Sequence, residues 1–208
     1  MSARPRVVGV GPGAPEALEE CLAEGGVAIF PADGVYGLCC DPLDGAAVSR
    51  IHAIKGRDEG KSSAVLYFSP LAMRELVSEL TPRVADAVGR LLPGPVTLIV
   101  PNPSGRYPLA CREDPGRLGV RLIAGPLGGM PLPIFQTSAN RAGAPSARSF
   151  DELDPEVLAE VDLAIDAGEL PGVESTVVDL CELEDRGEWE VLRSGAMDRA
   201  TLERLLSG

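Results

Sequence analysis

Residues 27–38 read Val27-Ala28-Ile29-Phe30-Pro31-Ala32-Asp33-Gly34-Val35-Tyr36-Gly37-Leu38, and this stretch favours an α/β fold. The apolar run at 27–30 is stopped by Pro31, which is typical of a buried strand that leads into a loop. Residues 31–38 are then expected to form a loop at the carboxyl end of that strand. Ligands of open α/β sheets bind at this end of the strands, so the loop is a candidate part of a binding site.

Predicted helices and strands alternate on both sides of this stretch. The first 15 residues are expected to form a loose leader into a helix at about 15–24, which Gly25-Gly26 ends. Downstream, Asp44 caps a predicted helix that ends at Gly56, and a strand follows at 64–68. Ser69-Pro70 and Thr81-Pro82 each begin a helix, the first reaching about residue 80 and the second about residue 92. Further strands are expected at 96–100, 118–123, 133–137, 162–166, 175–180 and 189–193, and further helices near 150–161 and 198–206.

The composition predicts a single α/β domain that covers residues 1–208. Among 208 residues only 4 Phe, 3 Tyr and 1 Trp are aromatic, so the core must consist of Leu, Val, Ile and Ala. Such a core suits a parallel or mixed sheet that is buried on both faces. The 24 Gly and 19 Pro predict many loops, and no charge block or low-complexity linker marks a domain boundary.

The charge balance excludes a broadly basic nucleic-acid-binding surface. The 31 acidic and 19 basic residues give a formal net charge of −12, and such a surface repels a polyanion. Any phosphate site must therefore be local. The five cysteines, Cys21, Cys39, Cys40, Cys111 and Cys181, form no C-x-x-C pair, which argues against a zinc framework. Without a signal peptide or a long apolar segment, the sequence predicts a cytoplasmic protein with reduced thiols.

A basic turn, Ile54-Lys55-Gly56-Arg57 with Lys61 nearby, follows the predicted helix at 44–56. Cations are favoured at the end of any helix, so a solvated helix terminus is one interpretation. The other is a clamp for a polyphosphate or carboxylate, in which arginine supplies a planar fork and lysine a point charge.

Two polar turns add hydroxyl and amide groups next to predicted strands. One covers residues 136–146, Gln-Thr-Ser-Ala-Asn-Arg-Ala-Gly-Ala-Pro-Ser, and the other covers 172–179, Gly-Val-Glu-Ser-Thr-Val-Val-Asp. Groups of this kind can bind phosphate and ribose oxygens without adding charge. Each turn alone is also compatible with an ordinary polar loop.

Eight segments taken together resemble the YrdC-like family of L-threonylcarbamoyladenylate synthases, in unbroken order from about residue 15 to 200. They are the Pro-x-x-x-Val-Tyr-Gly-Leu stretch at 31–38, Asp-Pro at 41–42, Lys-Gly-Arg at 55–57, Pro-Gly-Pro-Val-Thr at 93–97, Gly-Val-Arg at 119–121, Thr-Ser-Ala-Asn at 137–140 with Gly143, Ser-Thr-Val-Val-Asp at 175–179 and Leu-Arg-Ser-Gly at 192–195. The resemblance implies a twisted, mixed open sheet with flanking helices and a concave central cleft. It also implies the short, single-domain type, because 208 residues leave no room for the additional C-terminal domain of longer members.

The resemblance further implies an enzyme that joins L-threonine, bicarbonate and ATP, with Mg²⁺, into threonylcarbamoyl-AMP and pyrophosphate. Its product would pass to a tRNA threonylcarbamoyltransferase complex that modifies adenosine 37. The implied catalytic residues are Lys55, Arg57, Ser138 and Asn140, with both basic side chains exposed in the cleft. The same four residues with Ser146, Arg193 and Thr97 are the nucleotide-binding candidates, and Arg121, Ser175 and Gly34 the threonine-binding candidates. No residue is assigned to a metal, and the single histidine, His52, is not expected to be a general base.

The chain departs from the family pattern in its first loop. Many members have two threonines where this sequence has Ala32 and Gly34, so two hydroxyl groups that bear on threonine recognition are missing. Two alternatives stay open. One is a diverged paralogue that binds ATP or an adenylate and uses another substrate or none. The other is a translation-associated module that binds RNA through Lys55, Arg57, Lys61, Arg141 and Arg148, for which the charge of −12 predicts weak binding at most.

Overall fold

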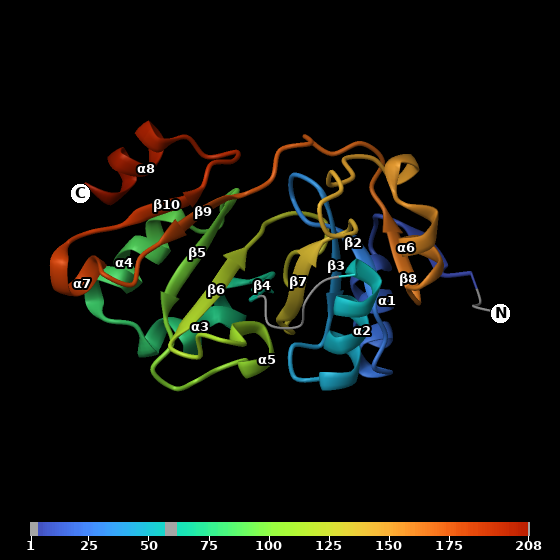
Figure 1. Ribbon diagram of the computed structural model, residues 1–208, viewed down its shortest axis with the longest axis horizontal. Coiled ribbons are helices and arrows are strands. Elements are labelled where there is room, and N and C mark those ends of the chain that lie inside the picture. Colours follow the sequence, from blue (N-terminus) through green and yellow to red (C-terminus); the bar gives the residue numbers. More distant parts are fainter. Residues whose placement is uncertain (1–3, 57–61, 208) are drawn as a thin grey trace.

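The computed structural model describes residues 4–56 and 62–207, whose strands join in one mixed sheet (Figure 1). The strand order is β1-β8-β2-β3-β7-β4-β6-β5-β9-β10. The strands are β1 (Arg6–Gly9), β2 (Ala28–Pro31), β3 (Tyr36–Cys40), β4 (Ala64–Tyr67), β5 (Val96–Pro101), β6 (Arg117–Leu122), β7 (Ile134–Ser138), β8 (Leu163–Asp166), β9 (Thr176–Asp179) and β10 (Glu190–Arg193). Pairs β1–β8, β2–β8, β4–β6 and β5–β9 are parallel and the other pairs are antiparallel.

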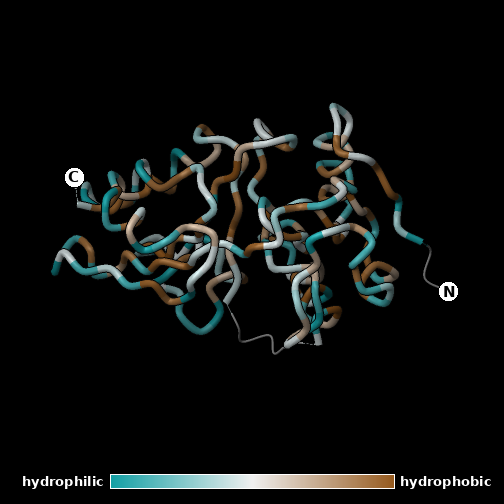
Figure 2. The backbone as a smooth tube through the Cα atoms, turned by 90° about the horizontal axis from the view of Figure 1, so that it is seen from above, coloured by the Kyte–Doolittle hydropathy of each residue, from teal (hydrophilic) through white to brown (hydrophobic). Residues whose placement is uncertain are grey.

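Helices flank this sheet, which confirms the predicted fold class of an α/β mixed open sheet. They are α1 (Ala14–Ala23), α2 (Gly45–Lys55), α3 (Pro70–Glu79), α4 (Pro82–Leu91), α5 (Pro108–Cys111), a 3₁₀ turn (Phe150–Glu152), α6 (Pro155–Ala159), α7 (Leu183–Arg186) and α8 (Arg199–Leu206). No helix within residues 4–56 and 62–207 is long and apolar enough to cross a membrane. Apolar stretches are instead short and interrupted by polar residues along the chain (Figure 2).

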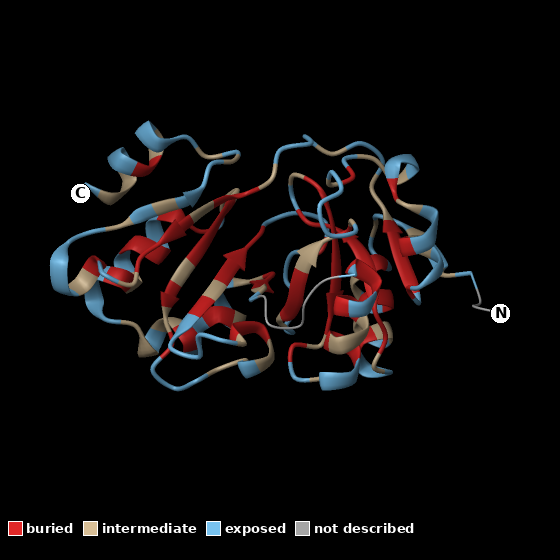
Figure 3. Cartoon of the chain, in the orientation of Figure 1, coloured by how far each residue is buried: buried red, intermediate tan, exposed pale blue. Residues whose placement is uncertain are grey.

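The two faces of the sheet carry different apolar clusters. Successive strand residues point to opposite faces. Ile29 of β2 belongs to a cluster that includes residues of helices α2, α3 and α4, whereas Ala28 and Phe30 belong to a cluster that includes residues of helix α1. Both clusters are buried (Figure 3). The α1 cluster includes residues of β2, β3 and β8 but none of β5 or β6. Among the residues that the structure describes, the apolar cluster on the α1 side therefore does not extend over β5 and β6.

Local signals at helix termini behave as expected from the sequence. The Asp44 carboxylate accepts hydrogen bonds from the backbone N–H groups of Ala46 (2.9 Å) and Ala47 (3.0 Å) at the start of α2. Helix α2 ends at Gly56, which has a left-handed φ of 57°. The Ser69 hydroxyl accepts from the Ala72 N–H (3.2 Å) at the start of α3. These contacts confirm the predicted boundaries of both helices.

Three predicted elements are wrong. The leader at 1–15 contains strand β1, which pairs in parallel with β8. The loop expected at 31–38 is a tight turn at 32–35 between β2 and β3, which form an antiparallel hairpin. The helix expected near 150–161 is divided, because the backbone of Asp154 is not helical (ψ 121°) and its carboxylate accepts from the Glu156 N–H (2.8 Å). Pro155 disfavours a helical conformation of the residue before it, so α6 begins anew at that position.

Candidate active site

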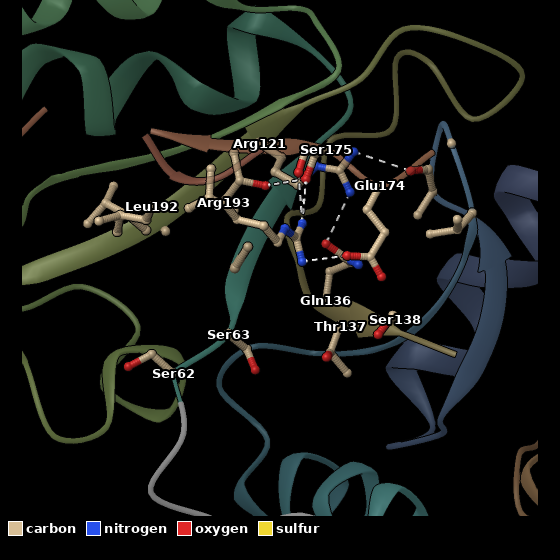
Figure 4. A pocket seen from close by; sticks show the side chains of 18 of the residues that line it. Ser62, Ser63, Arg121, Gln136, Thr137, Ser138, Glu174, Ser175, Leu192 and Arg193 are labelled. Atoms are coloured by element: carbon tan, nitrogen blue, oxygen red, sulfur yellow. Dashed lines mark hydrogen bonds and ion pairs between the residues drawn. The ribbon is translucent and has the colours of Figure 1, made fainter. Parts of the chain in front are cut away.

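A cavity of ≈ 430 Å³ lies on the uncovered part of the sheet, over β5, β6 and β7 (Figure 4). It is bordered by the hairpin turn at 32–35, by Ser62 and Ser63 before β4, and by Glu174 and Ser175 before β9. The residues that form it come from segments far apart in sequence. The cavity is thus the concave central cleft that the resemblance implied.

A period of two in the strands places polar side chains in this cavity. In β6, Leu118, Val120 and Leu122 are buried in the core behind the sheet, while Arg117, Gly119 and Arg121 line the cavity. In the same way Thr97 and Ile99 of β5 and Gln136 and Ser138 of β7 line it. Because no helix formed by residues 4–56 and 62–207 covers this part of the sheet, the residues there form a polar pocket in place of a second core.

Arg121 is a buried cation at one end of the pocket. Its residue is 4% exposed, and its guanidinium donates from Nη1 to Gln136 Oε1 (3.3 Å) and from Nη2 to the Ala32 carbonyl oxygen (3.2 Å). Burial lowers the pKa of Arg121 to about 10, which still leaves the group protonated at neutral pH. The Nε–H has no hydrogen-bond partner among the described residues. A buried cation with an unused donor is a suitable contact for an anion.

Arg193 and Glu174 form an ion pair beside Arg121. Arg193 Nη1 lies 2.7 Å from Glu174 Oε2, and Arg193 Nη2 donates to the Ser175 carbonyl oxygen (2.9 Å) and hydroxyl (3.2 Å). The Ser175 hydroxyl in turn shares a hydrogen bond of 2.8 Å with that of Thr97. Glu174 Oε1 accepts from the Ser146 hydroxyl (2.5 Å). The network fixes the position of both charges at this end of the pocket.

Lys55 does not reach the cavity as an exposed side chain, so this expectation is wrong. Its residue is 4% exposed at the end of α2. Its ammonium donates to the carbonyl oxygens of Ser138 (2.5 Å) and Asn140 (2.7 Å), and lies 3.2 Å from Asn140 Oδ1. The ammonium group thus holds the turn after β7 through its backbone carbonyl oxygens. Arg57, its partner in the basic turn, lies outside the described residues, as does Lys61.

The turn after β7 is closed by its own side chains. The Ser138 hydroxyl donates to Asn140 Oδ1, and Asn140 Nδ2 donates to the Ala144 carbonyl oxygen. Ser138 lines the cavity, whereas Asn140 and Ser146 do not. Asn140 and Ser146 are connected to the cavity by their hydrogen bonds to the lining residues Ser138 and Glu174. His52 is 1% exposed and its ring packs edge-on against Phe135 at 5.9 Å between centroids, away from the cavity.

Gly34 closes the hairpin turn against the segment of residues 167–175, which crosses from β8 to β9 (Figure 1). The Gly172 N–H donates to the Gly34 carbonyl oxygen (2.8 Å). A Cβ atom on Gly34 would lie 1.8 Å from the Val173 carbonyl oxygen. Position 34 therefore offers only backbone to the pocket.

The structure brings six of the predicted site residues to the cavity, which are Gly34, Thr97, Arg121, Ser138, Ser175 and Arg193. Five residues to which the sequence assigned no site role also line it, namely Ser63, Arg117, Gly119, Gln136 and Glu174. Of these, Gln136 and Glu174 lie in the two polar turns. The alternation of apolar with polar or small residues in 117–122 and in 96–100 was the available signal for the strand residues. Glu174 had no such signal, because its turn resembles any polar loop.

Comparison with known proteins gives matches over most of the chain. The sequence model of the Sua5/YciO/YrdC family, described as "Telomere recombination", matches residues 20–195. A curated protein of Xanthomonas axonopodis pv. citri, named threonylcarbamoyl-AMP synthase, is 38% identical over 152 residues, which are 70% of this chain and 81% of that protein. A Pyrococcus abyssi protein of the same name is 30% identical over 197 residues, which are 89% of this chain and 55% of that protein.

Solved structures share the fold. P. abyssi Sua5 complexed with L-threonine matches with a TM-score of 0.83 and 28% identity, covering 96% of this chain. This chain spans only 60% of that protein. Escherichia coli YciO matches with a TM-score of 0.76 and 23% identity over 97% of this chain and all of its own length, which shows likeness of fold.

Proposed function

Because the chain belongs to the Sua5/YciO/YrdC family, we propose that it is a threonylcarbamoyl-AMP synthase. It is an enzyme of the transferase class, and the proposal adds that it transfers an adenylyl group from ATP. The substrates would be L-threonine, bicarbonate and ATP, and the products threonylcarbamoyl-AMP and pyrophosphate. Curated relatives that are 30–38% identical carry this name, and one solved relative is a complex with L-threonine.

The buried guanidinium of Arg121 is the observation that carries the proposal. An arginine fork matches a carboxylate in shape and charge, and Arg121 lines the cavity. A ligand carboxylate would compensate for the water contacts that the Arg121 guanidinium lost on burial. Gly34 and Ser175 are the other residues that we assign to the amino-acid side of the pocket.

The proposed chemistry has two steps. Both require the substrates to be held in position and the developing charge to be stabilised, and neither requires a covalent nucleophile of the enzyme. The threonine ammonium first releases a proton to solvent. The free amine then attacks the carbon of bicarbonate, and the carbamate forms with loss of water. A carbamate oxygen then attacks the α-phosphorus of ATP, and the bond to the leaving pyrophosphate breaks. Negative charge grows on the leaving oxygens, which fixed cations and hydrogen-bond donors stabilise.

Residues around the cation pair and the turn after β7 suit the nucleotide. We assign to it Arg193, Thr97 and the turn residues Ser138, Asn140 and Ser146, of which Asn140 and Ser146 act through neighbours. Lys55 would hold this turn in shape. Only the resemblance to the family supports a contact of Lys55 with phosphate. Arg57 is proposed as a catalytic residue on the same ground.

A protein-held metal site does not fit the described residues. No group of three or more His, Cys, Asp or Glu side chains within 4–56 and 62–207 could hold an ion. Mg²⁺ commonly enters such enzymes on the phosphates of the nucleotide. We therefore assign no step of the reaction to residues that bind Mg²⁺.

The partner of this enzyme would be a tRNA threonylcarbamoyltransferase complex that consumes the product. Direct binding of tRNA is not part of the proposal, because the net charge of −12 opposes it. We also propose that residues 1–208 are one domain, which the single sheet supports.

Pyrophosphate release tests the proposal. The purified protein is incubated with ATP, Mg²⁺ and bicarbonate, together with L-threonine, L-serine, glycine or no amino acid. We expect threonine to stimulate release most strongly. Stimulation by another amino acid alone would identify a diverged paralogue, and no stimulation by any of them contradicts the proposal. Tight tRNA binding at physiological salt would favour the RNA-binding alternative instead.

A further inference from the structure

Glu174 is a carboxylate at the cationic end of the pocket that the proposed chemistry leaves without a role. Figure 4 shows its side chain together with those of Arg121, Gln136 and Arg193, while Ser62 and Ser63 lie at the opposite end. Arg121 interacts electrostatically with both Glu174 and Arg193. A negative charge beside Arg121 weakens its attraction for a ligand carboxylate, whereas a second cation would strengthen it. The negative charge of Glu174 therefore needs a separate explanation.

The contacts of Glu174 leave room for a ligand. Among the described residues each carboxylate oxygen has one partner, because Oε1 accepts from Ser146 and Oε2 faces Arg193. An ionised carboxylate offers about four acceptor positions, so about two of them are unused. The side chain is 37% exposed in the cavity. Its two partners hold the carboxylate in place and leave acceptor positions open.

The arrangement of charges matches an α-amino acid. In such a ligand one carbon atom separates the carboxylate from the ammonium group, so both ends must find partners in one small region. Arg121 lines the cavity and offers a cation for the carboxylate, and Glu174 offers its remaining acceptor positions for the ammonium. Arg193 balances the charge of Glu174 when no ligand is bound.

We propose that Glu174 is the ammonium-binding residue of this site and that, with Arg121, it selects a zwitterionic α-amino acid. The inference rests on the proposed function and adds to it the residue that positions the amine. Arg193 and Ser146 act as positioning residues for the Glu174 carboxylate. A ligand without the ammonium group loses this contact and gains nothing in return.

Two ligands and two proteins test the proposal without ATP. Calorimetric titration compares L-threonine with 3-hydroxybutanoate, which has the same carboxylate and hydroxyl groups but no amine. A hydrogen bond between charged groups changes affinity by at least about tenfold. We therefore expect the unaltered protein to bind threonine at least about tenfold more tightly than 3-hydroxybutanoate. Glu174→Gln should lose this preference by weakening threonine binding alone.

The controls separate this proposal from the proposed function. Glu182→Gln removes an exposed carboxylate that pairs with Arg186 (3.2 Å), and this variant should keep the full preference. If Glu174→Gln keeps it as well, Glu174 does not bind the ammonium. If the unaltered protein binds neither ligand nor any other amino acid, the proposed function itself is wrong. Should Glu174→Gln fail to fold, Glu174→Asp withdraws the carboxylate and should weaken threonine binding but not that of 3-hydroxybutanoate.

Discussion

The N–H of Gly172 donates to the carbonyl oxygen of Gly34 at 2.8 Å, which joins the 167–175 segment to the hairpin turn between β2 and β3. The two backbones are so close that a Cβ on Gly34 would lie 1.8 Å from the Val173 carbonyl oxygen. Gly34 has no left-handed φ, so close approach is what requires glycine here. The segment carries Glu174 and Ser175 into the pocket, and its position depends on this contact.

Gly34→Thr, which restores a hydroxyl that many family members have, should therefore impair the protein. The side chain would push Val173 and the following Glu174 away from the hairpin turn. Such overpacking costs about 1–3 kcal/mol of unfolding free energy, which urea denaturation measures. Pyrophosphate release should also fall, because Glu174 and Ser175 move.

The matched control is Gly45→Ala, since a Cβ on Gly45 meets no atom within 4 Å in the first turn of α2. This variant should be as stable as the unaltered protein or slightly more so. A Gly34→Thr protein with full stability and higher activity would show that the 167–175 segment moves freely to admit the hydroxyl.

Lys55→Met is expected to destabilise the protein as well as to inactivate it. The Lys55 ammonium holds two carbonyl oxygens of the turn after β7, those of Ser138 and Asn140. Leaving such buried acceptors without a donor costs roughly 1–3 kcal/mol. Chemical denaturation should report this loss even without any ligand.

An arginine on the surface provides the comparison for Lys55. Arg90→Met on α4 breaks an exposed pair with Asp86 (2.9 Å), and it should change stability by less than about 1 kcal/mol. If Lys55→Met is as stable as Arg90→Met yet inactive, Lys55 acts on substrate and does not hold the turn.

Arg121→Met should leave the ligand-free protein as stable as before, or make it more stable. Burial lowers the pKa of Arg121 to about 10, which means that the folded state disfavours the charged form. Replacing a buried charge with an apolar side chain of similar size often removes such a cost. Threonine should raise the melting temperature of the unaltered protein and not that of the variant.

The pH dependence of this difference follows from the lowered pKa. Above pH 10 the folded protein binds fewer protons at Arg121 than the unfolded chain does, so its stability rises with pH relative to the variant. Urea denaturation at pH 8 and at pH 11 should therefore show that the advantage of Arg121→Met shrinks. An advantage that grows with pH would show that burial does not disfavour the charge.

The part of the site that the sequence could predict is the part encoded in local patterns. Arg121, Ser175 and Arg193 lie in short motifs, and they line the cavity. Helix α2 was predictable from Asp44 and Gly56, because caps act on neighbouring residues. The sequence signals for the end of the helix, however, do not predict which groups the Lys55 side chain contacts in the folded protein.

Contacts between distant segments account for what the sequence could not predict. Residues 31–38 pair as a hairpin because β3 lies between β2 and β7, and no local signal states this pairing. Glu174 enters the site because Gly34 admits the 167–175 segment, across a separation of about 140 residues in the chain. The position of β1 at the sheet edge depends in the same way on β8.

Ser63 provides the last prediction, by contrast with its neighbour Ser62. The Ser62 hydroxyl donates to the Cys111 carbonyl oxygen (2.7 Å), whereas that of Ser63 is buried with no hydrogen-bond partner among the described residues. Both line the cavity, at the end opposite Arg121 (Figure 4). Ser62→Ala should cost about 1 kcal/mol of stability. Ser63→Ala should cost none and should weaken substrate binding, measured by KM for threonine and for ATP. If Ser63→Ala destabilises the protein as much as Ser62→Ala does and leaves both KM values unchanged, the Ser63 hydroxyl serves the fold and not a ligand.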